Sequence, residues 1–127
     1  MKKWEKLLKD KSYTPRDVDA AFCEKIEELK KKRTAIERDY LEGVRESRVG
    51  NFVTLQQSDY RIKMFVLQEH YDNKGKASYV RFGYYKVSLK KLETEGKLSI
   101  VWGRFNPTIP KKDFEKLVRI AEEKGIL

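Results

Sequence analysis

The stretch YRIKMFVLQEHYDNKGKASYVRFGYYKVS, residues 60–88, decides the fold. Its first part, residues 60–71, alternates apolar and polar side chains with a period of two, as a half-buried strand does. Residues 72–75 (DNKG) have the composition of a tight turn, and a second alternating run follows them. The stretch therefore predicts two antiparallel strands joined by a hairpin turn.

Further elements on both sides of this hairpin complete the predicted sheet. Residues 52–56 and 98–105 (LSIVWGRF) are typical of two more strands, so we expect an antiparallel sheet of about four strands. After residues 106–110 (NPTIP), a run that begins with proline and ends at Gly125 predicts a closing C-terminal helix. The apolar face of this helix consists of Phe114, Leu117, Val118 and Ala121.

The N-terminal part of the chain has helical rather than alternating spacing. We expect a short amphipathic helix over residues 2–10, and residues 14–17 (TPRD) form a start signal for a second helix. Apolar residues then recur three, four or seven positions apart over about thirty residues. They are Val18, Phe22, Ile26, Leu29, Ile36, Tyr40 and Val44. This spacing predicts one long helix that either lies across the sheet or pairs with a partner helix.

These elements place the chain in the α+β class. We expect one domain over residues 1–127, with a helical N-terminal segment in residues 1–49 and the sheet and C-terminal helix in residues 50–127. Cys23 is the single cysteine, which excludes an intramolecular disulfide and fits a cytoplasmic location. No apolar run is long enough to span a bilayer, so we expect no membrane partner. The charged fraction of 39%, rich in Lys, Glu and Arg, is typical of thermophilic proteins.

The net positive charge makes polyanions the first partners to consider. The chain carries 29 Lys and Arg against 20 Asp and Glu, which gives a net charge of +9. Residues 51–110, which hold the predicted sheet, contain 10 of these bases and 5 of the acids. Clustered positive charge attracts the phosphates of nucleic acids. We therefore expect the sheet to carry the binding surface.

Alternation with a period of two divides the predicted sheet into two faces. The face assigned to the core carries Ile62, Met64, Val66, Val80, Phe82, Tyr84, Leu98, Ile100 and Trp102. On the other face, bases alternate with aromatic rings. Because Lys and Arg neutralise phosphates and rings stack on unpaired bases, this pattern predicts a surface for single-stranded nucleic acid. The alternative is that helices cover both faces and that these rings belong to the core.

The candidate nucleic-acid-binding residues lie on this second face. The bases expected near phosphates are Arg61, Lys63, Arg81, Lys97 and Arg104, the last as an end-of-strand residue. The rings expected to stack on bases are Phe65, Tyr79, Tyr85 and Phe105. We expect the partner to be single-stranded nucleic acid, DNA rather than RNA, bound largely without regard to sequence. No small-molecule substrate is expected.

Signals for catalysis or metal binding are weak in this sequence. His70 is the only histidine, and on a strand it points away from its neighbour Glu69. Asp59, Glu69 and Asp72 are the only acids between residues 47 and 92, and the chain has no phosphate-binding loop or metal-ligand spacing. We expect no catalytic residues, no metal and no cofactor. A small ribonuclease that uses His70 or Glu69 is an alternative.

The order of elements over residues 51–127 is similar to that of known binding proteins. A basic antiparallel sheet with aromatic runs such as RFGYY (81–85) and VWGRFNP (101–107), followed by one helix, resembles the PC4-like single-stranded DNA-binding domains and the archaeal ThermoDBP-type single-stranded DNA-binding proteins. The resemblance implies non-enzymatic binding of single-stranded DNA by a homodimer or higher homo-oligomer. A second hypothesis, from another class, is a protein-interaction or assembly module that dimerises through the long helix.

Overall fold

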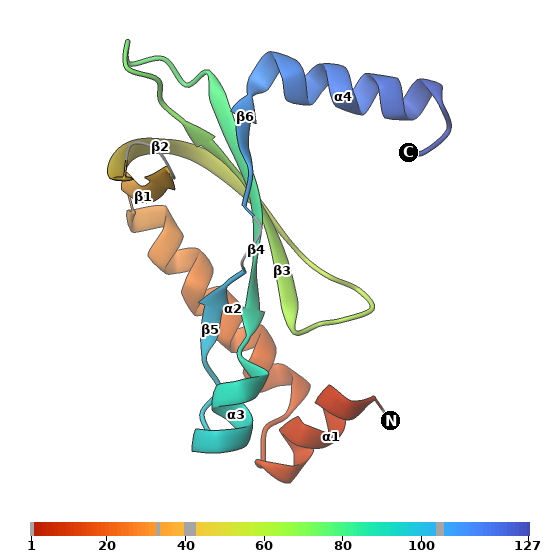
Figure 1. Cartoon of the computed structure of the whole chain (residues 1–127). Helices are drawn as coiled ribbons and strands as arrows, with labels where there is room; N and C mark the ends of the chain where they lie inside the picture. Colours follow the sequence, from red (N-terminus) through yellow and green to blue (C-terminus); the bar gives the residue numbers. More distant parts are fainter. Residues whose placement is uncertain (1, 33, 40–42, 104–105) are drawn as a thin grey trace. The chain divides into compact units, whose positions relative to one another are not determined.

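The computed structural model describes residues 2–32, 34–39, 43–103 and 106–127, with side chains in the ranges 2–32, 48–103 and 106–127. Its helices and antiparallel strands confirm the α+β class (Figure 1). In chain order the elements are α1 (Lys3–Asp10), α2 (Pro15–Lys31), β1 (Thr34–Asp39), β2 (Gly43–Gln56), β3 (Lys63–His70), β4 (Tyr79–Val87), α3 (Leu89–Glu95), β5 (Ile100–Trp102), β6 (Thr108–Pro110) and α4 (Lys111–Glu123).

Two compact units divide the chain, and each is assembled from three separate segments. The first unit comprises Met1–Lys31, Thr54–Val66 and Gly83–Phe105. The second unit comprises Lys32–Val53, Leu67–Phe82 and Asn106–Leu127. β2, β3 and β4 each begin in one unit and end in the other, so the chain enters each unit three times.

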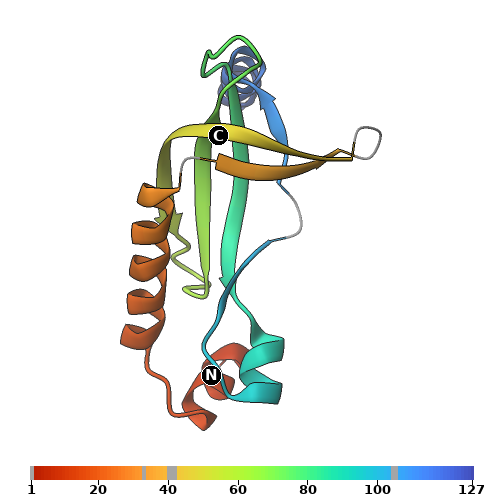
Figure 2. The same ribbon diagram turned by 90° about the vertical axis from the view of Figure 1, so that its left-hand side faces the viewer.

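The sheet is antiparallel and has the strand order β1-β2-β3-β4-β5, with β6 also paired to β4 (Figure 2). The hairpin predicted from residues 60–88 is confirmed as β3 and β4. Asp72 holds its turn, because Asp72 Oδ1 accepts hydrogen bonds from the backbone N–H groups of Lys74 and Lys76, both at 2.9 Å. Gly75 supplies the positive φ of 78° that the turn requires.

The long N-terminal helix predicted through Val44 is wrong beyond Lys31. α2 ends at Lys31, and the chain then forms β1, which pairs antiparallel with β2. The apolar positions Ile36, Tyr40 and Val44 are four residues apart, a spacing that fits a strand with a period of two as well as a helix. Tyr40 itself lies outside the described residues.

The apolar face of α2 is buried within the first unit. Val18 and Phe22 are each 2% exposed, and Leu29 is also buried. In the same unit, Met64 and Val66 of β3 and Val87 of β4 are buried, as is Ile62 just before β3. Full burial of such a side chain contributes about 1.5–3 kcal/mol. These three side chains of α2 are therefore covered by the chain itself.

The predicted core is confirmed on β3 and only in part elsewhere. The buried members of the nine are Ile62, Met64, Val66 and Val80. The half-buried members are Tyr84, Leu98, Ile100 and Trp102. Phe82 is 40% exposed, so its assignment to the core is wrong.

β5 and β6 pair with β4 in two different registers. These registers are Tyr85↔Trp102 for β5 and Arg81↔Thr108 for β6. Between the two pairs, β4 has three residues (82–84) and the facing chain has five (103–107). The facing chain therefore has two residues more than β4 between the two pairs. Of the strand predicted over residues 98–105, the structure shows Ile100–Trp102 as β5, and residues 104–105 lie outside the described residues.

α4 confirms the predicted C-terminal helix but leaves much of its apolar face uncovered within the second unit. None of its residues is buried, and Leu117 and Ile120 are 61% and 39% exposed. The first turn is tied to β3, because Lys111 Nζ donates a hydrogen bond to Glu69 Oε2. Figure 1 shows α4 continuing directly from β6. None of the helices in the described part of the chain has the length and apolar character needed to cross a membrane.

Candidate nucleic-acid interface

The register between β3 and β4 decides which side chains of β4 face α2. In the first unit the Val87 N–H donates to the Ile62 carbonyl at 2.9 Å, and both residues are buried. Alternation by two then places Gly83 and Tyr85 on the same face as Val87. Lys25 Nζ of α2 lies 5.4 Å from the centroid of the Tyr85 ring, in agreement with this placement. The outward orientation predicted for Tyr85 is therefore wrong.

On the face of β3 and β4 away from α2, one lysine lies near two tyrosine rings. Lys63 Nζ is 5.9 Å from the ring centroid of Tyr60 and 5.7 Å from that of Tyr84. The Tyr60 ring is also 4.6 Å from Lys2 Nζ and 6.4 Å, between centroids, from Trp4. We call Lys2, Trp4, Tyr60, Lys63 and Tyr84 the Lys63 cluster. Bases and rings adjoin in it, as the sequence predicts for a binding surface.

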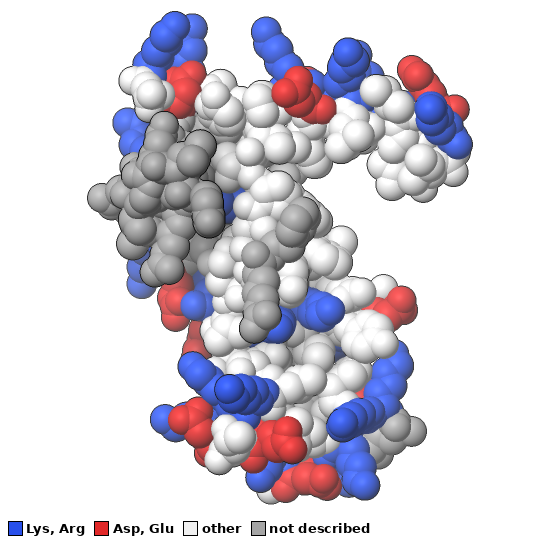
Figure 3. All heavy atoms as spheres, viewed as in Figure 1, with Lys and Arg blue, Asp and Glu red and all other residues white. Residues whose placement is uncertain are grey.

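The positive charge of Lys63 is not neutralised by an acid in the described part of the chain. Lys63 makes no ion pair with any residue whose side chain is described. Tyr60 is 43% exposed, so solvent reaches the ring beside this charge. Lys2 Nζ donates to the backbone carbonyl of Asp59 at 3.1 Å, and no acid with a described side chain forms an ion pair with it. Figure 3 shows basic side chains beside uncharged surface around α1 and α3, with acidic side chains among them.

Gly103 supports the position of Tyr84 in the cluster. The Gly103 N–H donates to the Tyr84 carbonyl at 2.8 Å, which continues the pairing of β4 and β5 by one residue beyond Trp102. The Tyr84 ring covers the position where a side chain at residue 103 would begin. An aromatic ring over a strand glycine is a known way to shield exposed backbone. The glycine thus fixes where the ring lies.

Arg61, predicted to lie near phosphate, is held by a carboxylate of α2. Its Nη2 donates to both carboxylate oxygens of Asp19, at 2.8 and 2.7 Å. Gln56 Nε2 donates to the same carboxylate at 3.0 Å. The hydrogen bond from Arg61, and after it the one from Gln56, holds the pKa of Asp19 below its ordinary value. The same contact raises the pKa of Arg61 and joins the turn before β3 to α2.

Two further candidates are engaged by neighbouring side chains. The Tyr85 ring packs edge-to-face on Trp102, with 4.5 Å between the centroids. Arg81 is half-buried, and its Nε donates to Thr108 Oγ1 on β6 at 3.2 Å. Both side chains therefore contribute to the pairing of β4 with its edge strands.

The remaining candidates are not brought together in one described site. Tyr79 is 38% exposed and belongs to the second unit. Lys97 is exposed and Phe65 half-buried, both in the first unit. Arg104 and Phe105 lie outside the described residues. Of the nine candidates, Lys63 is the one that the described structure places in the Lys63 cluster.

The residues of the ribonuclease alternative, His70 and Glu69, have the following surroundings. His70 is 2% exposed, and its Nε2 lies 3.2 Å from Gln68 Oε1. Hydrogen bonds from Lys111 and from the Asn51 N–H hold the pKa of Glu69 below its ordinary value. Over the residues with described side chains, no group of three or more His, Cys, Asp and Glu could hold a metal ion. Glu69 is thus engaged by Lys111 and Asn51, and His70 is buried beside Gln68.

Sequence reasoning missed four members of the Lys63 cluster. Tyr84 was assigned to the core because alternation alone does not choose between the two faces of β4. Lys2 and Trp4 belong to α1, far from β3 in sequence, and only the fold brings them to Tyr60. The available signal was Tyr60 itself, an aromatic residue three positions before Lys63 at the start of the alternating run.

Comparison with known proteins identifies no relative. No protein-family model, no curated protein and no solved structure matches this chain. The functional interpretation therefore depends on the residues of the site.

Proposed function

We propose that this protein binds single-stranded nucleic acid, DNA in preference to RNA, through the Lys63 cluster. The observation that carries the proposal is the position of Lys63, whose amino group lies 5.9 and 5.7 Å from the rings of Tyr60 and Tyr84 and makes no ion pair with a described side chain. A phosphate at this amino group brings the adjoining bases next to both rings.

The chemistry of the cluster suits an unpaired strand. Stacking of one base on an aromatic side chain contributes about 1–3 kcal/mol and tolerates any base. Duplex DNA keeps its bases stacked on one another, so the rings gain little from it. Contacts between lysine and phosphate release counterions, which makes the affinity fall as salt rises. The net charge of +9 supports a polyanionic partner.

The proposed role is that of a non-enzymatic, cytoplasmic binding protein. This role is also the one implied by the resemblance to the ThermoDBP-type proteins of thermophilic archaea. The single cysteine and the charged fraction of 39% support such a setting.

A titration with labelled oligonucleotides tests the proposal. Fluorescence anisotropy compares the binding of single-stranded DNA, single-stranded RNA and duplex DNA at two salt concentrations. Each probe is about 15 nucleotides or base pairs long, which matches the site sizes of single-strand-binding proteins. Tyr60→Ala and Tyr84→Ala are each expected to weaken single-strand binding about fivefold or more, and Tyr60→Phe to retain it. Wild-type affinity in both alanine variants would contradict the proposal.

Tyr79→Ala is the matched control for these variants. Tyr79 is an exposed ring of the second unit, and it lies outside the Lys63 cluster. We expect this variant to bind as the wild type does. A loss confined to Tyr79→Ala would favour the surface predicted from the sequence over the Lys63 cluster.

Self-association through α4 is a second proposal. It is supported by the exposure of Leu117 and Ile120 on a helix with no buried residue, since exposed apolar faces mark interaction sites. The first part of the helix, residues 111–119, is net basic, whereas Glu122 and Glu123 follow near its end. Antiparallel pairing with α4 of a second copy would place the basic part against these acids. We propose such a homodimer in place of pairing through the long helix.

A further inference from the structure

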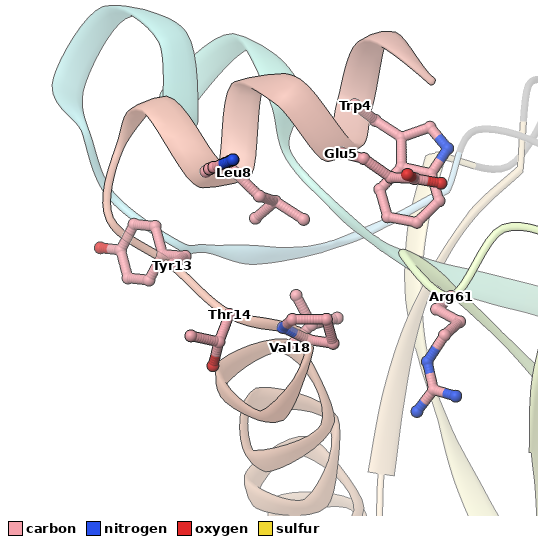
Figure 4. A pocket seen from close by; sticks show the side chains of 9 residues that line it. Trp4, Glu5, Leu8, Tyr13, Thr14, Val18 and Arg61 are labelled. Atoms are coloured by element: carbon pink, nitrogen blue, oxygen red, sulfur yellow. The ribbon is translucent and has the colours of Figure 1, made fainter. Parts of the chain in front are cut away.

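A cavity of about 440 Å³, partly open to solvent, lies in the first unit and is lined by α1, the start of α2 and Arg61 (Figure 4). Its walls are largely apolar and include Leu8, Tyr13 and Val18. The volume is in the range of pockets that bind small ligands. Trp4 lines this cavity and also belongs to the Lys63 cluster, so a strand bound at the cluster lies one side chain away from the cavity.

Most polar groups around the cavity are already engaged. Thr14 Oγ1 donates to Asp17 Oδ2 at 3.1 Å, within the start signal of α2. Arg61 is held by both carboxylate oxygens of Asp19. The Tyr13 hydroxyl donates to a backbone carbonyl after α3, at 3.0 Å. These groups are therefore committed to the fold rather than open to a ligand.

Glu5 differs from them. Its side chain is half-buried, lines the cavity and makes no hydrogen bond or ion pair with any described residue. Figure 4 shows it on the same side of α1 as Trp4. A carboxylate beside an apolar wall is stabilised by hydrogen-bond donors. Lys9, one turn later on the same helix, is exposed at the cavity and carries a charge that suits a phosphate.

A guanine base has the matching chemistry. Its pairing edge presents two adjacent N–H donors, which fit the two oxygens of one carboxylate, and its flat ring suits apolar walls. Thymine and uracil present a single N–H between two carbonyl oxygens, and these oxygens would face the carboxylate. Bases of single strands are commonly recognised by stacking combined with hydrogen bonds to this edge.

We propose that the cavity captures one guanine of the bound strand, with Glu5 accepting from the base, Trp4 packing on its ring and Lys9 near its phosphate. This inference rests on the proposed function. It adds one base-selective position to binding that is otherwise tolerant of sequence.

The experiment compares strands that differ in one base. The probes are an all-thymidine strand and the same strand with a single central guanine or adenine. We expect the wild-type protein to bind the guanine strand at least about fivefold more tightly than the all-thymidine strand, the lower limit for one bidentate base contact. Glu5→Gln is expected to lose this preference and to bind the all-thymidine strand at least as tightly as the wild type does.

Glu93→Gln is the matched control, because it makes the same charge change on the exposed surface of α3, outside the cavity. It should keep the guanine preference. Equal affinities of the wild type for the three strands, or a preference that survives Glu5→Gln, would overturn guanine capture and leave binding at the Lys63 cluster intact. Failure of the wild type to bind any of the strands would overturn both.

Discussion

The Tyr84 ring lies so close to Gly103 that a Cβ atom at residue 103 would be 2.4 Å from Cζ and 2.5 Å from Cε2 of the ring. Contacts this short do not occur in folded proteins, so a side chain at residue 103 must displace either the ring or the strand. The same ring lies 5.7 Å from Lys63 Nζ. The glycine therefore links the edge of the sheet to the Lys63 cluster.

Gly103→Ala is expected to lower stability by about 1–3 kcal/mol, as overpacking does, and to weaken single-strand binding because the Tyr84 ring moves. Thermal unfolding and anisotropy titration measure the two effects. In a Tyr84→Ala background, Gly103→Ala should change stability and binding little further, because the ring that the new Cβ atom would contact is absent. An equal loss in both backgrounds would show that the ring is not the cause.

Lys63→Gln is expected to reduce the slope of log Kd against log salt by about one, the change for one lost phosphate contact. When the amino group of Lys63 contacts a phosphate, it releases one counterion from the nucleic acid, and glutamine at this position does not. Titrations of labelled single-stranded DNA over a salt series measure the slope. Lys116→Gln, at an exposed position of α4, removes the same charge and should leave the slope unchanged. Identical slopes for Lys63→Gln and the wild type would contradict the assignment.

Asp19→Asn is expected to lower the Tm at neutral pH and to have no effect in strong acid. Hydrogen bonds from Arg61, and secondly from Gln56, hold the pKa of Asp19 below its ordinary value. A lowered pKa in the folded state contributes stability above the ordinary pKa, and this contribution is lost as the pH falls through the folded-state pKa. Because solvent screens this partly exposed pair, the difference in Tm should be small.

Thermal unfolding of the wild type and Asp19→Asn from neutral to strongly acidic pH checks this prediction. The two Tm curves should converge on the acid side. A gap that stays constant over the whole range would indicate that the substitution acts through packing rather than through the ionised carboxylate.

Leu117→Glu is expected to convert a homodimer into a monomer without unfolding the monomer. Leu117 is 61% exposed within its own chain, so the charge meets solvent there but meets an apolar face in a dimer. Sedimentation velocity gives the mass, and circular dichroism confirms the fold. Lys116→Ala, one position away and off the apolar face, is the control. A wild-type chain that stays monomeric at all concentrations would refute the α4 dimer.

The β3–β4 hairpin could be predicted because two local signals agree over residues 60–88, a period of two and a turn composition. The end of α2 could not be predicted, because Ile36 and Val44 are eight residues apart, a multiple of two that also falls within the broad apolar face of a helix. The bases around Arg33 favour helix by propensity and so give no stop signal. Pairing of β1 with β2 overrides that propensity.

The candidate site depends on contacts that are distant in sequence. Both alternating sets of β4 contain aromatic residues, so composition does not decide which set faces α2. The hydrogen bond between Val87 and Ile62 decides it, and this contact is a property of the register. Lys63 was predicted from local alternation, whereas Trp4 comes from another element and joins the cluster only through the fold.

Between the β4–β5 and β4–β6 pairs, the chain from 103 to 107 is two residues longer than the facing part of β4 from 82 to 84, and two is an even number. Side chains alternate between the two faces along a strand. With an even surplus, β6 side chains such as Ile109 face the same side as they would in a strand without extra residues. With an odd surplus they would face the opposite side. Deletion of one codon in this segment is therefore expected to disrupt β6, whereas deletion of two is expected to be tolerated. Length variation in the gene at this point should accordingly occur in steps of two codons.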